Sequence, residues 1–141
     1  MDLQEVYTEL IMEHNMSKRN RREILGCDAC EKGHNPSCGD EIEIQVKYDG
    51  DKISDLAFTG TGCAISQAST SMMIDLVKGK TKEEAKEFIH TFLGMIKRDI
   101  KDEETLETLE DAMVLQNISN MPARVKCAVL AWHTLDEIMK K

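Results

Sequence analysis

A hairpin signal in the first half of the chain limits its fold more than any other feature. Apolar and polar residues alternate over residues 41–47, which is the period of a half-buried strand. Asp49-Gly50-Asp51 then marks a turn, and the apolar residues within 53–58 indicate a returning strand, although its alternation is imperfect. The segment therefore predicts two antiparallel strands that bury one face.

The same hairpin is expected to bring together residues that could bind a metal. Cys38 and Asp40 come directly before its first strand, and Cys63 follows its second strand. Antiparallel pairing places the start of one strand beside the end of the next. We therefore expect Cys38, Asp40 and Cys63 to be neighbours.

Helical periodicity dominates the remainder of the chain. Residues 26–39 are expected to form a loop because glycine, asparagine and proline interrupt them. A Thr-x-x-Glu capping box marks one helix start at Thr81, and Pro122 suits the first turn of the last helix. The expected helices cover about residues 2–15, 63–79, 81–96, 99–111 (on the surface) and 122–138. The pattern predicts an α+β fold, a small antiparallel sheet with helices packed on one side.

Length and composition exclude several classes of protein. At 141 residues, a single compact domain over residues 1–141 is expected. The first residues do not resemble a signal peptide, and no run approaches the ~20 apolar residues of a membrane span. We therefore expect a cytoplasmic chain and no membrane partner. In that reducing location, clustered cysteines more often serve metal or sulfur chemistry than disulfides, and the chain has five cysteines. The net charge of −8 argues against a nucleic-acid partner.

A short basic run, residues 18–22, departs from this acidic balance. We expect it to be a solvated helix end. A docking patch for an acidic protein is the alternative.

Three cysteines lie at expected element ends. Cys63 and Cys127 fall near helix N-termini, where free N–H groups and the helix dipole favour a thiolate. Together with Cys38 and the Asp40 carboxylate they would suit a tetrahedral zinc ion, or an iron–sulfur site with one ligand that is not cysteine. Arg124 lies on the same helix face as Cys127. It either pairs with Asp40 or the thiolates, or is a solvent-facing charge.

Two further cysteines form the motif Cys27-Asp28-Ala29-Cys30, with His34 nearby. This spacing is common in metal sites, but the second pair of ligands that a zinc finger needs is missing. We expect two loop thiols without a fixed ligand. A second metal site or an auxiliary sulfur relay is the alternative.

Three ordered motifs, at residues 35–40, 60–69 and 122–132, resemble those of the U-type iron–sulfur cluster assembly family. That family contains IscU, SufU and the N-terminal domain of NifU. Within it the chain looks most like the SufU branch. IscU-type members carry a histidine directly before the last cysteine, where this chain has Lys126, and residues 99–117 resemble a SufU insertion.

The resemblance implies a zinc ion held by Cys38, Asp40, Cys63 and Cys127. It implies a cysteine desulfurase of the SufS type as partner, followed by downstream iron–sulfur assembly proteins, and Cys127 as acceptor of persulfide sulfur. Arg124 would assist. The chain would then be a sulfurtransferase or an accessory assembly protein. The alternatives are a scaffold that builds and transfers a [2Fe–2S] cluster, with iron in place of zinc, and a structural zinc module that only binds proteins.

Overall fold

The computed structural model describes residues 3–36 and 39–140. Its helices and strands lie in the order α1 (Leu3–Met16), β1 (Ala29–Asn35), β2 (Asp40–Asp49), β3 (Lys52–Thr61), α2 (Ala64–Val77), α3 (Lys82–Ile96), α4 (Glu103–Glu107), the 3-10 helix η1 (Glu110–Ile118) and α5 (Pro122–Met139). None of the helices in the described residues is long and apolar enough to cross a membrane.

The predicted hairpin is confirmed as strands β2 and β3. They pair antiparallel from Glu41 opposite Thr61 to Asp49 opposite Lys52, with one irregularity at Lys47 and Tyr48. The register brings the start of β2 beside the end of β3, as the sequence required.

A third strand, β1, was not predicted. Residues 29–35 pair antiparallel with β2, so the sheet has the order β1-β2-β3 and the expected loop at 26–39 is wrong over this range. Gly33 explains why the sequence signal was weak. A Cβ at this position would lie 2.3 Å from Thr134 Oγ1, so α5 packs directly against the β1 backbone. This contact is possible because Gly33 has no side chain, and so the strand does not need an apolar residue at this position.

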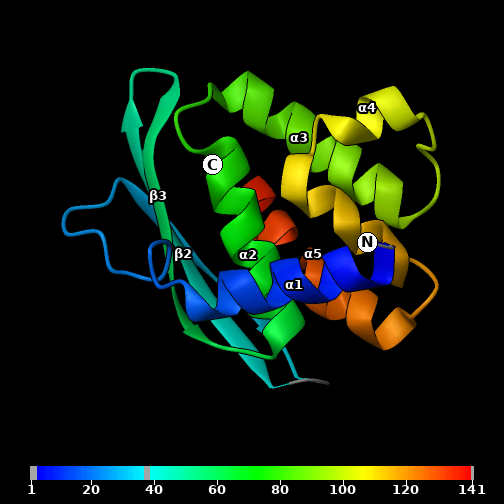
Figure 1. Cartoon of the computed structure of the whole chain (residues 1–141). Helices are drawn as coiled ribbons and strands as arrows, with labels where there is room; N and C mark the ends of the chain where they lie inside the picture. Colours follow the sequence, from blue (N-terminus) through cyan, green and yellow to red (C-terminus); the bar gives the residue numbers. More distant parts are fainter. Residues whose placement is uncertain (1–2, 37–38, 141) are drawn as a thin grey trace.

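The helices cover one face of the sheet, which confirms the α+β prediction (Figure 1). Ile42, Ile44 and Val46 point into the core and are almost completely buried. Helix α5 packs on β1 and β2, while α2 packs on β3. Trp132 of α5 stacks on Phe92 of α3, with ring centroids 4.0 Å apart, and so joins the last helix to the core.

Several helix boundaries match the sequence. The capping box at Thr81 is present, with Glu84 N donating to Thr81 Oγ1 at 3.1 Å. Pro122 begins α5 as predicted. The surface helix expected over 99–111 is instead the short α4 followed by η1, because Glu110 adopts a φ of 52° that interrupts a regular helix.

The basic run at residues 18–22 is not a solvated helix end, because α1 ends at Met16. Its three arginines bind within the chain. Arg19 pairs with Asp75 and Arg22 with Asp55, whereas Arg21 donates to Gln67 Oε1 at 2.9 Å. Arg22 N also donates to Phe58 O at 3.1 Å, so the segment runs along the outer edge of β3.

Candidate metal centre

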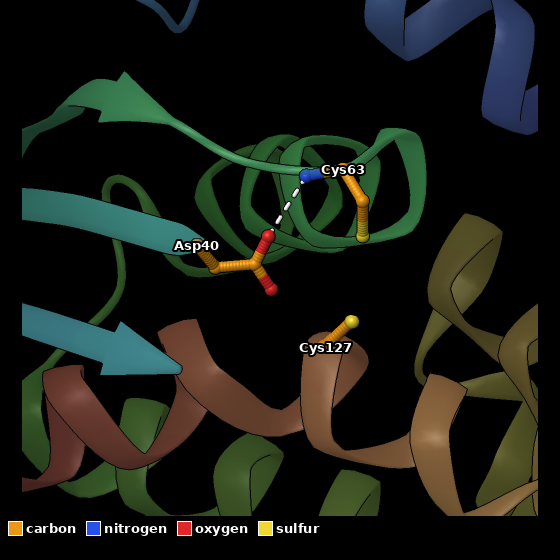
Figure 2. Close-up of side chains that lie close together, drawn as sticks. All are labelled: Asp40, Cys63 and Cys127. Carbon is orange, nitrogen blue, oxygen red and sulfur yellow. Dashed lines mark hydrogen bonds between the residues drawn. The ribbon is translucent and has the colours of Figure 1, made fainter. Parts of the chain in front are cut away.

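Three side chains from distant parts of the chain converge at one end of the sheet. Asp40 begins β2, Cys63 directly precedes α2, and Cys127 lies in the second turn of α5. One ligand atom from each lies within 4.8 Å of the others. Figure 2 shows the two sulfurs and the Asp40 carboxylate facing a common space.

Asp40 is the most buried member of the group, with 0% of its surface exposed. Its Oδ1 accepts a hydrogen bond from Cys63 N at 2.8 Å. Its other oxygen, Oδ2, is buried without a hydrogen-bond partner among the described residues. A buried acceptor without a partner costs about 1–3 kcal/mol. A cation at this point would supply the missing partner.

Cys63 is held at the N-terminus of α2. Its Sγ accepts from Ser66 N at 3.4 Å, so the cysteine caps the helix. The free N–H groups of a helix start carry partial positive charge, which favours a thiolate. The predicted position of Cys63 at a helix start is confirmed.

Cys127 faces Asp40 and Cys63 from the opposite side of the site. Only 3% of it is exposed. Its Sγ lies 3.8 Å from Asn35 Nδ2, at the end of β1, and 3.6 Å from Ala123 O within α5. Strand β1 therefore helps to enclose the site.

Gly62 leaves room for this arrangement. A Cβ on Gly62 would lie 2.9 Å from Asp40 Oδ1 and 3.2 Å from Ser66 Oγ. Any larger residue would push the carboxylate away from Cys63 or displace the start of α2. Steric crowding therefore explains why the residue before Cys63 is a glycine.

Arg124 lies in the first turn of α5 and is exposed. Asp40 is not among its ion-pair partners within the described residues, but its side chain hydrogen-bonds to Tyr7 of α1. Burial raises the pKa of Tyr7; the positive Arg124 opposes that shift, and the electrostatic effect of Cys63 adds to it. Tyr7 therefore lies beside the site, and sequence analysis did not single it out.

The sequence also named Cys38, Cys27, Cys30 and His34 as candidates. Cys38 falls outside the described residues, so its place as a fourth ligand stays a prediction. Cys27 is half-buried, and Cys30 and His34 are exposed on β1. Within the described part of the chain, the only group of three or more potential ligands is Asp40, Cys63 and Cys127.

The donor set fits a zinc ion. Two cysteine sulfurs and one carboxylate oxygen are ordinary zinc ligands, and Cys38 would complete a tetrahedron. The same set also fits an iron–sulfur cluster with one oxygen ligand. The unpartnered Asp40 Oδ2 is satisfied in either case.

Comparisons with known proteins agree with this fold. Residues 6–141 match the family model described as NifU-like N terminal domain. The chain is 38% identical to "Iron-sulfur cluster assembly scaffold protein IscU" of Streptococcus pyogenes serotype M1, over 99% of this chain and 86% of that protein. It is also 38% identical to "Zinc-dependent sulfurtransferase SufU" of Bacillus subtilis, over 99% and 93%. A crystal structure of a putative scaffold protein for the SUF system from Fervidobacterium islandicum superposes with a TM-score of 0.86 at 40% identity, covering 95% of this chain and 96% of that one.

Proposed function

Because the chain belongs to the family of NifU-like N-terminal domains, we propose that it serves iron–sulfur cluster assembly as a zinc-binding sulfur acceptor. Its whole length, residues 1–141, would form one domain of the SufU type. The observation that carries the proposal is the buried Asp40 oxygen without a partner, beside Cys63 and Cys127. The zinc-dependent relative and Lys126 before the last cysteine favour the SufU branch.

Cys38, Asp40, Cys63 and Cys127 would hold the zinc ion, which keeps thiolates deprotonated without oxidising them. Sulfur would arrive as a persulfide on a cysteine desulfurase of the SufS type. The Cys127 thiolate attacks the outer sulfur, the sulfur–sulfur bond of the donor breaks, and the donor leaves as a thiolate. The new persulfide on Cys127 is then passed to downstream iron–sulfur assembly proteins in the cytoplasm.

Burial sets a condition on this transfer. Cys127 is only 3% exposed, so the partner must open the site before the donor sulfur reaches it. Arg124 and Lys126 are both exposed on the first turns of α5. Their positive charge would attract an anionic persulfide to this side of the site. Cys38 is the competing acceptor within the same ligand set.

A scaffold for a [2Fe–2S] cluster is the second candidate function. The same donor set could hold iron, and the relative from Streptococcus pyogenes carries the name of a scaffold protein. Metal analysis of anaerobically purified protein separates the two, because zinc protein is colourless and a cluster absorbs visible light. About one zinc per chain is expected. A purely structural zinc module would bind zinc but leave a desulfurase unstimulated.

Substitution of the cysteines tests the acceptor. With Cys127→Ser we expect a folded chain that no longer stimulates alanine release from cysteine by the desulfurase. The double variant Cys27→Ser with Cys30→Ser is the matched control and should keep most of the stimulation. Mass spectrometry then locates the persulfide. Persulfide on Cys38 would make Cys38 the acceptor, and persulfide on Cys27 or Cys30 would contradict the assignment altogether.

A further inference from the structure

The cysteine pair before and within β1 has no role in the candidate metal centre. Cys30 pairs opposite Gln45, whereas Asn35, near Cys127, pairs opposite Asp40 at the other end of the strand. Five residues of strand cover about 17 Å at roughly 3.3 Å per residue. Residues 30, 32 and 34 are exposed while residues 33 and 35 are buried, so Cys30 lies on the sheet face that the helices leave open.

The backbone around the two cysteines is fixed against β2. Asp28 N donates to Val46 O at 2.8 Å, and the Asp28 carboxylate accepts from Tyr48 N at 2.8 Å. Lys47 Nζ donates to Gly26 O at 3.3 Å. The residues on both sides of Cys27 are therefore anchored, and the segment is not the free loop that the sequence suggested.

The two cysteines are three positions apart on this anchored backbone, and Cys27 is near enough to contribute to the raised pKa of Cys30. Cys30 is exposed, so a small molecule can reach its thiol. Cys27 is half-buried nearby and can react with Cys30 in a second step. The described residues supply no third ligand that would make this pair a metal site. Two adjacent thiols on an anchored backbone suit closure of a disulfide, because little chain entropy is lost on closure.

We propose that Cys27 and Cys30 form a redox site that is reversibly oxidised to a disulfide by low-molecular-weight disulfides. The Cys30 thiolate attacks the small disulfide, and a mixed disulfide forms as the first small thiolate leaves. The Cys27 thiolate then attacks the Cys30 sulfur and expels the second small thiolate. The protein loses two electrons, the small disulfide gains them, and the two protons of the protein thiols pass to the two small thiols.

Partial desolvation by the neighbouring chain raises the pKa of the exposed Cys30 thiol, and the Glu43 carboxylate and Cys27 add to the shift. A thiol with a raised pKa is a weaker attacking group at neutral pH and a poorer leaving group. The first attack by Cys30 is therefore slow at neutral pH, and the disulfide, once formed, resists reduction by a single small thiol.

Oxidised glutathione, applied to the zinc-loaded protein, tests the proposal. We expect wild type to lose the mass of two hydrogens, with a peptide map that links Cys27 to Cys30, and dithiothreitol to reverse the change. Each single variant, Cys27→Ser or Cys30→Ser, should instead hold one stable glutathione adduct, at the remaining cysteine. Zinc content should not change, because the pair lies far from the metal centre.

Stable glutathione adducts on wild type at both cysteines would contradict the proposal, and so would a disulfide that includes Cys63 or Cys127. Thiols of the pair that stay reduced in wild type while the single variants are modified would also overturn it. The circular dichroism spectra of both variants, compared with wild type, verify that each is folded. The assay does not depend on sulfur transfer, so it stands or fails separately from the proposed function.

Discussion

Replacement of Asp40 by asparagine tests whether its unpartnered oxygen serves a metal. The amide oxygen can still accept from Cys63 N, which lies 2.8 Å from the present carboxylate. The amide nitrogen takes the place of Oδ2 and can donate to a neighbouring sulfur. Without metal, the free energy of unfolding should therefore not fall. Relief of a buried acceptor without a partner would add up to about 1–3 kcal/mol.

Zinc should act in the opposite direction and stabilise wild type more than Asp40→Asn. At a free zinc concentration of about 100 times the wild-type Kd, binding adds about 2.7 kcal/mol to stability. Loss of an outer-shell partner of a metal typically weakens affinity by about 10–100-fold, and we expect a similar range when the Asp40 carboxylate becomes a neutral amide whose oxygen can still bind the metal. At the same free zinc the variant then gains only about 0.4–1.4 kcal/mol. For a chain of this size the difference in the zinc-dependent rise of Tm is about 3–9 °C.

The assay is thermal unfolding, followed by circular dichroism, in a chelator and in buffered zinc. Asp136→Asn is the matched control, since Asp136 pairs with Lys140 one turn further along α5 and belongs to no group of potential metal ligands among the described residues. It should respond to zinc as wild type does. An equal zinc response of Asp40→Asn and wild type would show that the carboxylate is not a ligand, and the interpretation of Oδ2 would be wrong.

Two predictions concern stability away from the metal. The hydrogen bond from Arg22 lowers the pKa of Asp55 to about 2. A lowered pKa stabilises the fold above the unfolded-state value of about 3.9, and this contribution is lost as pH falls through about 2. After solvent screening, Asp55→Asn should cost about 1 kcal/mol at pH 7, and urea unfolding should show that most of this difference is lost near pH 2. Ser69 Oγ accepts from Trp132 Nε1 at 2.9 Å and donates to Ala128 O at 2.6 Å. Ser69→Ala leaves the buried Trp132 Nε1 donor without its partner and should lower the free energy of unfolding by about 1–3 kcal/mol. An unchanged midpoint of urea unfolding would contradict this network.

The hairpin and the last helix were predictable because their signals are local. Alternation over residues 41–47 fixes which side of β2 is buried, and Pro122 fixes where α5 starts. The meeting of Asp40 with Cys63 follows from antiparallel register alone. For these elements, short-range pattern and tertiary structure require the same conformation.

Strand β1 could not be predicted because its pairing depends on contacts outside the segment. Its residues carry almost no apolar pattern. Its buried Gly33 is required because Thr134 of α5 lies too close to the strand for a side chain at this position. The basic run was misread for a related reason. Its arginines find Asp75 and Asp55, carboxylates that are distant in sequence. Periodicity carries no information on such pairs.

The two halves of the metal centre differ in how they are held. Asp40 and Cys63 are joined by a direct hydrogen bond, so this half of the site is in place before a metal binds. Cys127 is positioned by the packing of α5, which Trp132 fixes against Phe92 further along the same helix. A metal ion is therefore not needed to hold α5 on the core. Its binding free energy can instead oppose the cost of crowding two thiolates and one buried carboxylate within 4.8 Å. Repulsion among these crowded ligands would weaken the bond between the metal and any single sulfur. A site that releases one thiolate to a partner requires such a weakened bond.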